Sequence, residues 1–177
     1  MRHALIALAV PALLAPALAL ANAGGASPSA ARAELADASG RIVGTAKVKA
    51  VGAHGLRLTI AVKGLEPGVR GVHLHAVGQC DGPAFTSAGP HWNPDSRKHG
   101  RDNPEGAHRG DLPNLTVKPG GRGTLDFTLH GAHLDGAGGL LDSDGAAIVI
   151  HARADDYRTD PSGSSGDRVI CGVLRSR

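Results

Sequence analysis

The sequence predicts an all-β fold of about eight short antiparallel strands, arranged as a Greek-key barrel or sandwich. Apolar and polar residues alternate along several short segments, 26 glycines and 11 prolines supply frequent turns, and no long helical pattern occurs. Roughly 150 residues remain once an N-terminal leader is set aside, which is the size of one domain with a single core. Aromatic residues make up only 2% of the chain, so aliphatic side chains must fill that core.

Residues 1–23 have the composition of a secretory signal peptide. A short cationic start precedes an apolar run, Ala4 to Leu20, and small residues follow at alternate positions. Cleavage is expected after Ala23, with two alternative sites after Ala19 and Ala21. A membrane anchor is the competing interpretation, but Pro11 and Pro16 interrupt the run. We therefore expect an exported chain, periplasmic or secreted, with no membrane span after the signal is removed.

The two cysteines and the net charge restrict the class of protein further. Cys80 and Cys171 form an even pair in an exported chain, so a disulfide is expected rather than two free thiols. Without Arg2, 18 basic residues face 16 acidic ones, a formal net charge of +2. A charge this small, with no block of lysines or arginines in the sequence, does not indicate a nucleic acid partner.

The first half of the chain contains a leader and four predicted strands. Residues 24–31 are rich in Gly, Ser and Ala and are expected to be flexible, so the folded domain comprises residues 32–177. In the second strand, alternate residues from Ile42 onward fall on one face, with Lys47 and Lys49 on the other. The four segments are Arg32 to Leu35, Arg41 to Val51, Leu56 to Lys63, and Val72 to Ala76.

A long loop divides these strands from the rest. Between Val77 and Pro113 the alternation disappears, and a structureless stretch of this length is usually functional. A metal and a disulfide would supply the order that its composition lacks. Regular strands then resume, with a second irregular stretch before the last one. The four segments are Asn114 to Val117, Gly123 to Leu129, Ala146 to His151, and Arg168 to Leu174.

Five of the ten histidines are concentrated in one region, Gly71 to Asp111. Imidazole and carboxylate suit zinc and copper, although histidines also cluster on solvated loops. The first two stand two residues apart on a predicted strand, so both leave the same face roughly 7 Å apart. The other three, with an aspartate, form a closed set typical of structural zinc. The first pair is His73 and His75, with His151 on another strand as a further partner, and the second set is His91, His99, His108 and Asp111.

Six segments, taken in order from about residue 34 to the C-terminus, resemble the signatures of copper/zinc superoxide dismutase. They are GVHLH, AGPHWNP, KHG, AHRGDLPN, VIHARADDY and GDRVICGVL. The resemblance implies an eight-stranded Greek-key β-barrel with long metal-binding and electrostatic loops. It also implies an enzyme that converts superoxide, a small anion, to dioxygen and hydrogen peroxide and protects the cell envelope. Cys80 lies five residues after His75, which is similar to bacterial periplasmic members.

The resemblance implies a role for each candidate residue. One copper ion would be bound by His73, His75, His91 and His151, and one zinc ion by His91, His99, His108 and Asp111. Deprotonated His91 would bridge the two ions and exchange a proton as copper alternates between Cu(II) and Cu(I). Asp155 matches an aspartate that links a copper-binding histidine to a zinc-binding histidine. Arg168 matches the arginine that guides superoxide to copper, and Cys80 and Cys171 match the family's disulfide.

Two other functions also use such ligands. A metal-sequestering protein on the same scaffold is disfavoured because the ligand set and Arg168 are complete. A zinc hydrolase is disfavoured because no glutamate in this region is placed as a general base. Monomer and homodimer both remain open. Four residues are expected to have no chemical role, namely His54, His130 and His133 as solvated residues and Trp92 as a packing residue. Ser162 and Ser164 replace the threonine and asparagine of many members, so the channel rim is expected to differ in detail.

Overall fold

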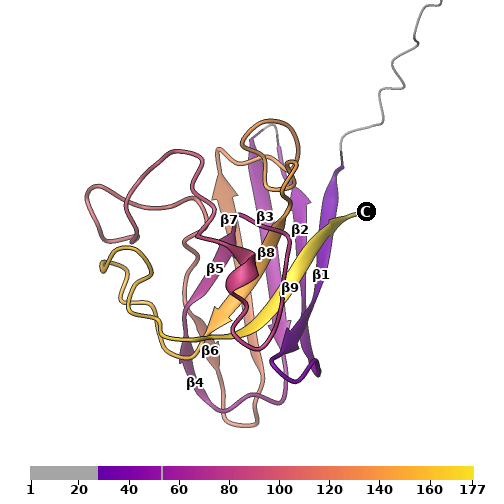
Figure 1. Ribbon diagram of the computed structural model, residues 1–177, viewed down its shortest axis with the longest axis vertical. Helices are drawn as coiled ribbons and strands as arrows, with labels where there is room; N and C mark the ends of the chain where they lie inside the picture. Colours follow the sequence, from indigo (N-terminus) through magenta and orange to yellow (C-terminus); the bar gives the residue numbers. More distant parts are fainter. Residues whose placement is uncertain (1–27, 53) are drawn as a thin grey trace, which may run out of the picture.

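The computed structural model describes residues 28–52 and 54–177, so the predicted signal peptide lies outside the described residues (Figure 1). Strand β1 begins at Ala30, two residues before the expected start of the domain. Among the described residues, no helix has the length and hydropathy needed to cross a membrane. The elements are β1 (Ala30–Asp37), β2 (Ile42–Ala50), β3 (Gly55–Val62), β4 (Gly68–Arg70), β5 (Val72–His75), the 3-10 helix η1 (Thr86–Ala88), β6 (Leu115–Val117), β7 (Gly123–His130), β8 (Ala146–His151) and β9 (Arg168–Ser176).

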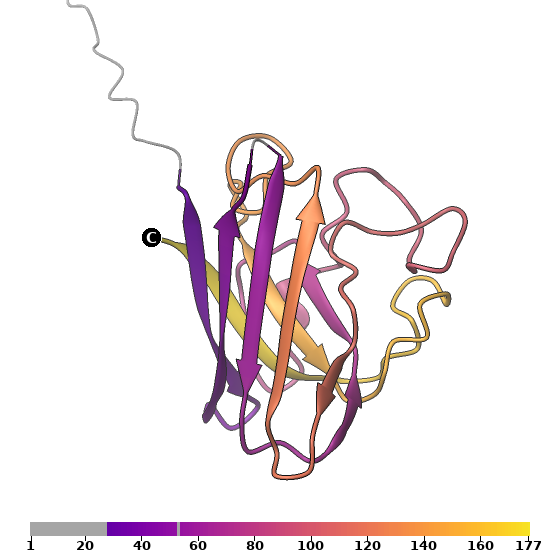
Figure 2. The same ribbon diagram turned by 180° about the vertical axis from the view of Figure 1, so that it is seen from behind.

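The nine strands of the described residues join in one antiparallel sheet, in the order β4-β6-β7-β3-β2-β1-β9-β8-β5. The two ends of this order, β4 and β5, are consecutive in the chain and separated only by Gly71. The sheet therefore curls into a nearly closed barrel (Figures 1 and 2). Strand β7 returns to pair with β3 after three intervening strands, which is a Greek-key connection. The predicted all-β Greek-key fold is confirmed, with short β4 as a strand beyond the eight expected.

The barrel interior is aliphatic, as the composition predicts. Along β3, the alternate residues Leu56, Leu58 and Ile60 are fully buried. The expected inner face of β2 is not buried at either end of the strand. The last residue, Ala50, is exposed, and at the start Ile42 is 47% exposed whereas Val43 is only 1% exposed. The register with β1 explains the change at Ile42. Leu35 pairs with Gly44 but the next residue of β1 pairs with Ile42, so Val43 is the extra residue of a β-bulge.

Strand β8 is buried on both faces, and this positions the functional region. Ile148 and Ile150 belong to the barrel core, whereas Ala147 and Val149 pack with Phe85 and other residues outside the barrel. The long loop that follows β5 supplies this outer cover, including η1. The predicted disulfide between Cys80 and Cys171 is present, with Cα atoms 5.7 Å apart, and it attaches the same loop to β9.

Candidate metal centre

The outer face of β5 carries the first two candidate ligands. His73 pairs with Val149 and His75 with Ala147 across the β5–β8 ladder, so both histidines lie on the side covered by the long loop. Strand β5 ends the sheet order, so its other edge is free to pair with that loop. Isolated bridges join His73 to Asp111 and His75 to His91. Backbone pairing thus fixes the loop ligands beside the strand ligands.

His73, His75 and His151 share one arrangement. One ring nitrogen of each forms a hydrogen bond, and the other ring nitrogen has no hydrogen-bond partner in the described residues. The held nitrogens donate from His73 Nε2 to Asp155 Oδ2 at 2.8 Å, from His75 Nδ1 to Gly89 O at 2.9 Å, and from His151 Nδ1 to Gly166 O at 3.0 Å. Within the described residues, the opposite nitrogens are buried without a hydrogen-bond partner: His73 Nδ1, His75 Nε2 and His151 Nε2. Buried polar atoms are rarely left unsatisfied. A ring whose proton is held on one nitrogen offers a lone pair on the other, which is what a metal ligand requires.

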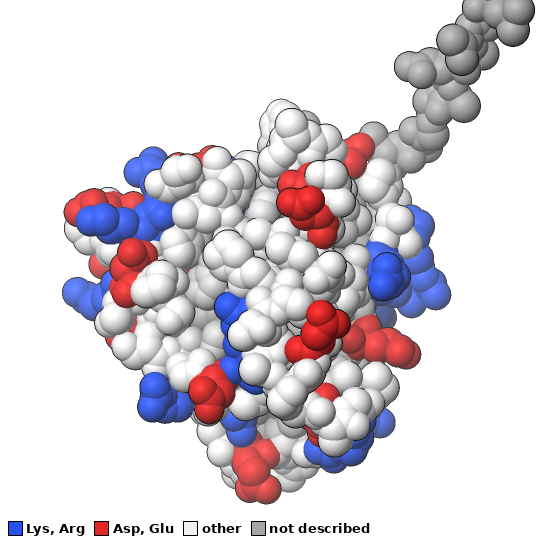
Figure 3. All heavy atoms as spheres, in the orientation of Figure 1, with Lys and Arg blue, Asp and Glu red and all other residues white. Residues whose placement is uncertain are grey.

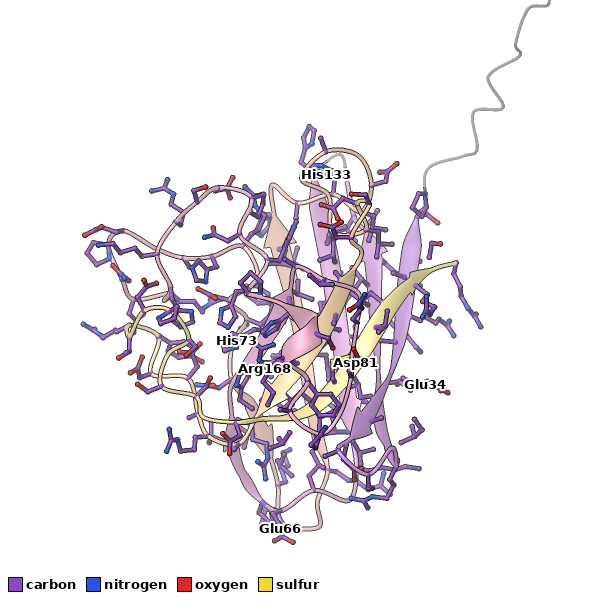
Figure 4. The ribbon with its side chains drawn as sticks, in the orientation of Figure 1. Glu34, Glu66, His73, Asp81, His133 and Arg168 are labelled. Atoms are coloured by element: carbon purple, nitrogen blue, oxygen red, sulfur yellow. A yellow bond between two sulfur atoms is a disulfide. The ribbon has the colours of Figure 1, made fainter. Side chains whose placement is uncertain are left out.

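With His91, these three residues form one set of converging ligands. One nitrogen of each of the four lies within 4.8 Å of the others, and all four residues are buried. Figure 4 shows His73 and Arg168 on the same side of the barrel, beside η1. Four imidazoles converging in this way suit a borderline transition metal such as copper.

A second set surrounds the carboxylate of Asp111. Its Oδ1 lies 3.0 Å from His91 Nδ1, 3.0 Å from His99 Nδ1 and 3.3 Å from His108 Nδ1, and the Nδ1 atoms of His91 and His108 are 3.3 Å apart. Four ligand atoms about 2.0 Å from a tetrahedral zinc ion would be separated by about 3.3 Å. His99 Nδ1 has no hydrogen-bond partner despite its closeness to Asp111. The spacing therefore fits ligands that share a metal better than a hydrogen-bonded cluster.

His91 belongs to both sets, and the membership of His73 and His108 follows from geometry. Closeness alone would also place His73 near the second set, because its ring stacks on His91 with centroids 3.9 Å apart. However, Nε2 of His73 is occupied by Asp155, and its free nitrogen belongs to the first set. His108 instead places Nδ1 3.3 Å from both His91 and Asp111. We therefore take His108 as the fourth member of the second set.

Asp155 connects the two sets. Its Oδ2 accepts a hydrogen bond from His73 Nε2 at 2.8 Å, and its Oδ1 accepts one from His99 Nε2 at 3.1 Å. The side chain of Asn114 forms two hydrogen bonds with the backbone of Asp155. Its Oδ1 accepts from the N–H and its Nδ2 donates to the carbonyl oxygen, both at 2.9 Å. The Tyr157 hydroxyl accepts from the backbone N–H of Asn114 at 2.7 Å. Both supporting residues lie within the motifs AHRGDLPN and VIHARADDY, although the sequence alone assigned them no role.

Burial sets the protonation of the first set. Because the charged form loses its solvation, the pKa of His73 falls to about 3, that of His75 to about 2 and that of His151 to about 4. These rings are therefore neutral near pH 7 and need lose no proton before they bind a metal. The unperturbed histidine value is about 6.5.

The second set behaves differently because it contains the carboxylate. Burial would raise the pKa of Asp111, but the three imidazoles around its carboxylate, those of His108, His91 and His99, outweigh it and hold that pKa below its usual range. Burial likewise opposes protonation of His99, yet the carboxylates of Asp111 and Asp155 raise its pKa to about 9. A divalent cation would replace the proton on His99 and satisfy the carboxylate directly.

Arg168 lies at the edge of a cavity that reaches the first set. The cavity, of about 780 Å³, is lined by His91, His151 and Arg168 among others. The guanidinium donates to Phe85 O and to Gly89 O, both at 2.9 Å. Gly89 O also accepts from His75 Nδ1, so one loop carbonyl holds both the cation and a candidate ligand. Ser162 lines the same cavity, whereas Ser164 is exposed.

The remaining residues singled out from the sequence contribute no ligand to either set. His54, His130 and His133 are exposed. Trp92 is buried in the barrel core. Its backbone N–H donates to Leu74 O and its carbonyl oxygen accepts from the Gly110 N–H, both at 2.8 Å. This backbone pairing fixes the chain next to His91.

Comparisons with known proteins agree with this geometry. The family described as copper/zinc superoxide dismutase (SODC) matches residues 42–174. The protein named Superoxide dismutase [Cu-Zn] of Caulobacter vibrioides is 43% identical over 126 residues, covering 69% of this chain and 72% of that protein. Its namesake in Deinococcus radiodurans is 38% identical over 181 residues, covering 96% and 97%. The crystal structure of a SOD-like protein from Bacillus subtilis is 39% identical, with a TM-score of 0.78, and the match covers 81% of this chain and 97% of that chain.

Proposed function

The chain belongs to the copper/zinc superoxide dismutase family, and we propose that its two ligand sets hold one copper and one zinc ion per subunit. The observation that carries this proposal is the set of buried ring nitrogens without partners on His73, His75, His99 and His151. The four imidazoles of the first set suit copper. The closed set of three imidazoles and a carboxylate suits structural zinc.

The proposed reaction converts two superoxide anions and two protons to dioxygen and hydrogen peroxide. Bound copper would supply a one-electron couple, Cu(II) and Cu(I), and bound zinc a fixed charge without redox chemistry. His91 would hold and return a proton at Nε2, because its Nδ1 faces Asp111 in the zinc set. Asp155 would keep the rings of His73 and His99 oriented through the cycle.

Arg168 would bring the anion to the cavity. Its guanidinium is fixed by two backbone carbonyls next to His151, so its charge remains at the cavity without a carboxylate partner among the described residues. Electrostatic guidance of superoxide is a general property of superoxide dismutases, and such guidance weakens as ionic strength rises.

The Arg168→Ala variant is expected to dismutate superoxide about tenfold more slowly at low salt, with a weaker dependence on salt. Both metals should remain bound, because Arg168 contributes no ligand atom to either set. Decay of superoxide measured at several ionic strengths checks the result. Arg158→Ala is the matched control, since Arg158 is an exposed cation and its side chain is 73% accessible. Loss of metal from the Arg168 variant would contradict a role in guidance.

Replacing Asp155 by asparagine is expected to weaken binding of both metals, by about 10- to 100-fold each. His73 and His99 bond to different oxygens of Asp155, and the amide of asparagine replaces one of these oxygens with an NH2 group that cannot accept. Titration against a competing chelator measures the two affinities. Asp156→Asn is the control, because Asp156 is the exposed neighbour that bonds to Thr159 instead. Unchanged affinities in the Asp155 variant would exclude the linking role.

We further propose that the protein acts outside the cytoplasm, in the periplasm or after secretion, and protects the cell envelope. The disulfide and the bacterial relatives support this location. The function is tested by superoxide decay in the presence of the metal-loaded mature protein. If both metals bind stoichiometrically but decay matches that in buffer, the chain is a metal-sequestering protein and the enzymatic proposal fails. Sedimentation of the same sample would distinguish monomer from homodimer.

A further inference from the structure

The outer face of β9, β1 and β2 carries a row of cations that the dismutation proposed above does not use. Arg32 on β1 pairs directly with Lys47 on β2 and with Arg175 on β9. All three side chains are exposed. Lys49 stands two pairs further along β2, opposite Ala30, and the backbone N–H of Arg177 donates to Ala30 O at the same end. We call these five residues, Arg32, Lys47, Lys49, Arg175 and Arg177, the cationic groove.

The cations of this groove lack ion-pair partners in the part of the chain that the structure describes. Among residues 28–52 and 54–177, none of the five forms an ion pair, whereas the neighbouring Arg57 pairs with Asp126 at 2.6 Å. Glu34 is the single acidic residue in the lining. Like charges directly opposite each other on neighbouring strands destabilise a sheet. The row is thus unfavourable for the protein alone, and an external anion would relieve it.

The surface between these side chains is concave. A groove of about 490 Å³ is lined by Arg32, Lys47, Arg175 and Arg177, with Glu34 and small residues between them. Since neighbouring strands are about 4.8 Å apart, the three-strand row is roughly 10 Å long. Figure 3 shows Lys and Arg atoms gathered on the flank next to the grey trace. Figure 4 shows Glu34 on this flank, well away from His73 and Arg168.

We propose that the cationic groove binds a linear anionic polysaccharide and so holds the protein at a polyanionic layer outside the cell. Closely spaced carboxylate or sulfate groups along such a chain would meet the cations of the row in succession. Three of the five cations are arginines, whose planar guanidinium groups match these anions with paired hydrogen bonds.

Other occupants fit the groove less well. Its lining contains no aromatic side chain on which nucleic acid bases could stack. It also lacks the large apolar side chains with which proteins insert into a membrane surface, since Val173 is only partly exposed. A twofold contact with a second copy would place the same cations against each other. A flexible polyanion satisfies the charges and the concave shape together.

The test compares two double variants of the metal-loaded mature protein. Arg32→Gln/Lys47→Gln removes two cations from the groove, and Lys118→Gln/Arg122→Gln removes two exposed cations from the β6–β7 turn. Both change the net charge equally. Calorimetry would measure binding to polygalacturonate, which carries carboxylates, and to dextran sulfate, with neutral dextran as the blank. These two arms distinguish carboxylate from sulfate as the bound group.

The groove variant is expected to bind at least one of the two polyanions on the order of tenfold more weakly than the unmodified protein. The slope of log Kd against log salt should decrease by roughly two, because two cations have been removed. The turn variant should keep the affinity and the slope of the unmodified protein. The melting temperature of the groove variant should not fall, because the change removes like-charge repulsion. Superoxide decay should be unaffected in both variants, so this test is independent of the proposed dismutation.

Three results would overturn the proposal. Equal weakening in the two variants would show that binding follows net charge alone. Absence of binding to both polyanions at low salt would show that the groove has no such ligand. Tighter groove-dependent binding of duplex DNA, or of vesicles containing phosphatidylglycerol, would assign the groove to a different class of partner.

Discussion

Replacement of His151 by alanine is expected to abolish superoxide dismutation while leaving the zinc set intact. His151 ends β8, and its Nε2 is one of the buried nitrogens without a partner, directed toward His73, His75 and His91. It contributes no atom to the group around Asp111. The rate should fall by more than roughly 100-fold, which exceeds the usual effect of removing a residue that only supports a metal ligand.

Metal analysis and superoxide decay on the same sample check this expectation. Copper should bind less than stoichiometrically or much more weakly, and zinc should stay at one ion per chain. His133→Ala is the matched control, because His133 is an exposed histidine on the β7–β8 connection. A variant that retained the unmodified rate would remove His151 from the copper set. Equal loss of both metals would instead show that His151 holds the whole centre together.

The sequence predicts well those parts of the fold that depend on local alternation. The buried residues of β3 follow directly from the period of two between Leu56 and Ile60. The exposure of Ile42 could not be predicted in this way, because the bulge at Val43 arises from the register between β1 and β2. Strand β4 is similarly non-local. Residues Gly68–Arg70 form a strand only because barrel closure places β6 beside them.

The candidate site shows the same division. Ligand side chains stand out in the sequence because histidine and aspartate are chemically distinctive. The groups that orient the rings include Gly89 O and Gly166 O. Every residue has a backbone carbonyl, so the sequence does not show which of them will bind a histidine ring. The cationic groove could not be predicted from the sequence for another reason. Arg32 and Arg175 lie near opposite ends of the chain and become neighbours only through β1–β9 pairing.

Removal of the disulfide, by Cys80→Ala together with Cys171→Ala, is expected to lower the free energy of unfolding by about 4 kcal/mol. The cross-link spans 91 residues, so its loss allows the unfolded chain many more conformations. Chemical denaturation of the metal-free protein would measure the change, because bound metals would add their own stabilisation. Thiol-reduced unmodified protein is the control, since it lacks the cross-link but keeps both cysteines. A change below about 1 kcal/mol in both samples would contradict the expectation.

The disulfide should also affect catalysis, through the loop segment that it ties to β9. Between Cys80 and His91, this segment contains Phe85 and Gly89, whose carbonyl oxygens hold the Arg168 guanidinium. Gly89 O also orients His75, so loosening the segment would disturb a copper ligand and the guiding cation together. We therefore expect the metal-loaded double variant to retain zinc but to dismutate superoxide more slowly and with a weaker dependence on salt. The same change is expected of Arg168→Ala. An unchanged rate in the folded variant would mean that packing of Phe85 and Ala88 against Val149 holds Gly89 in place without the cross-link.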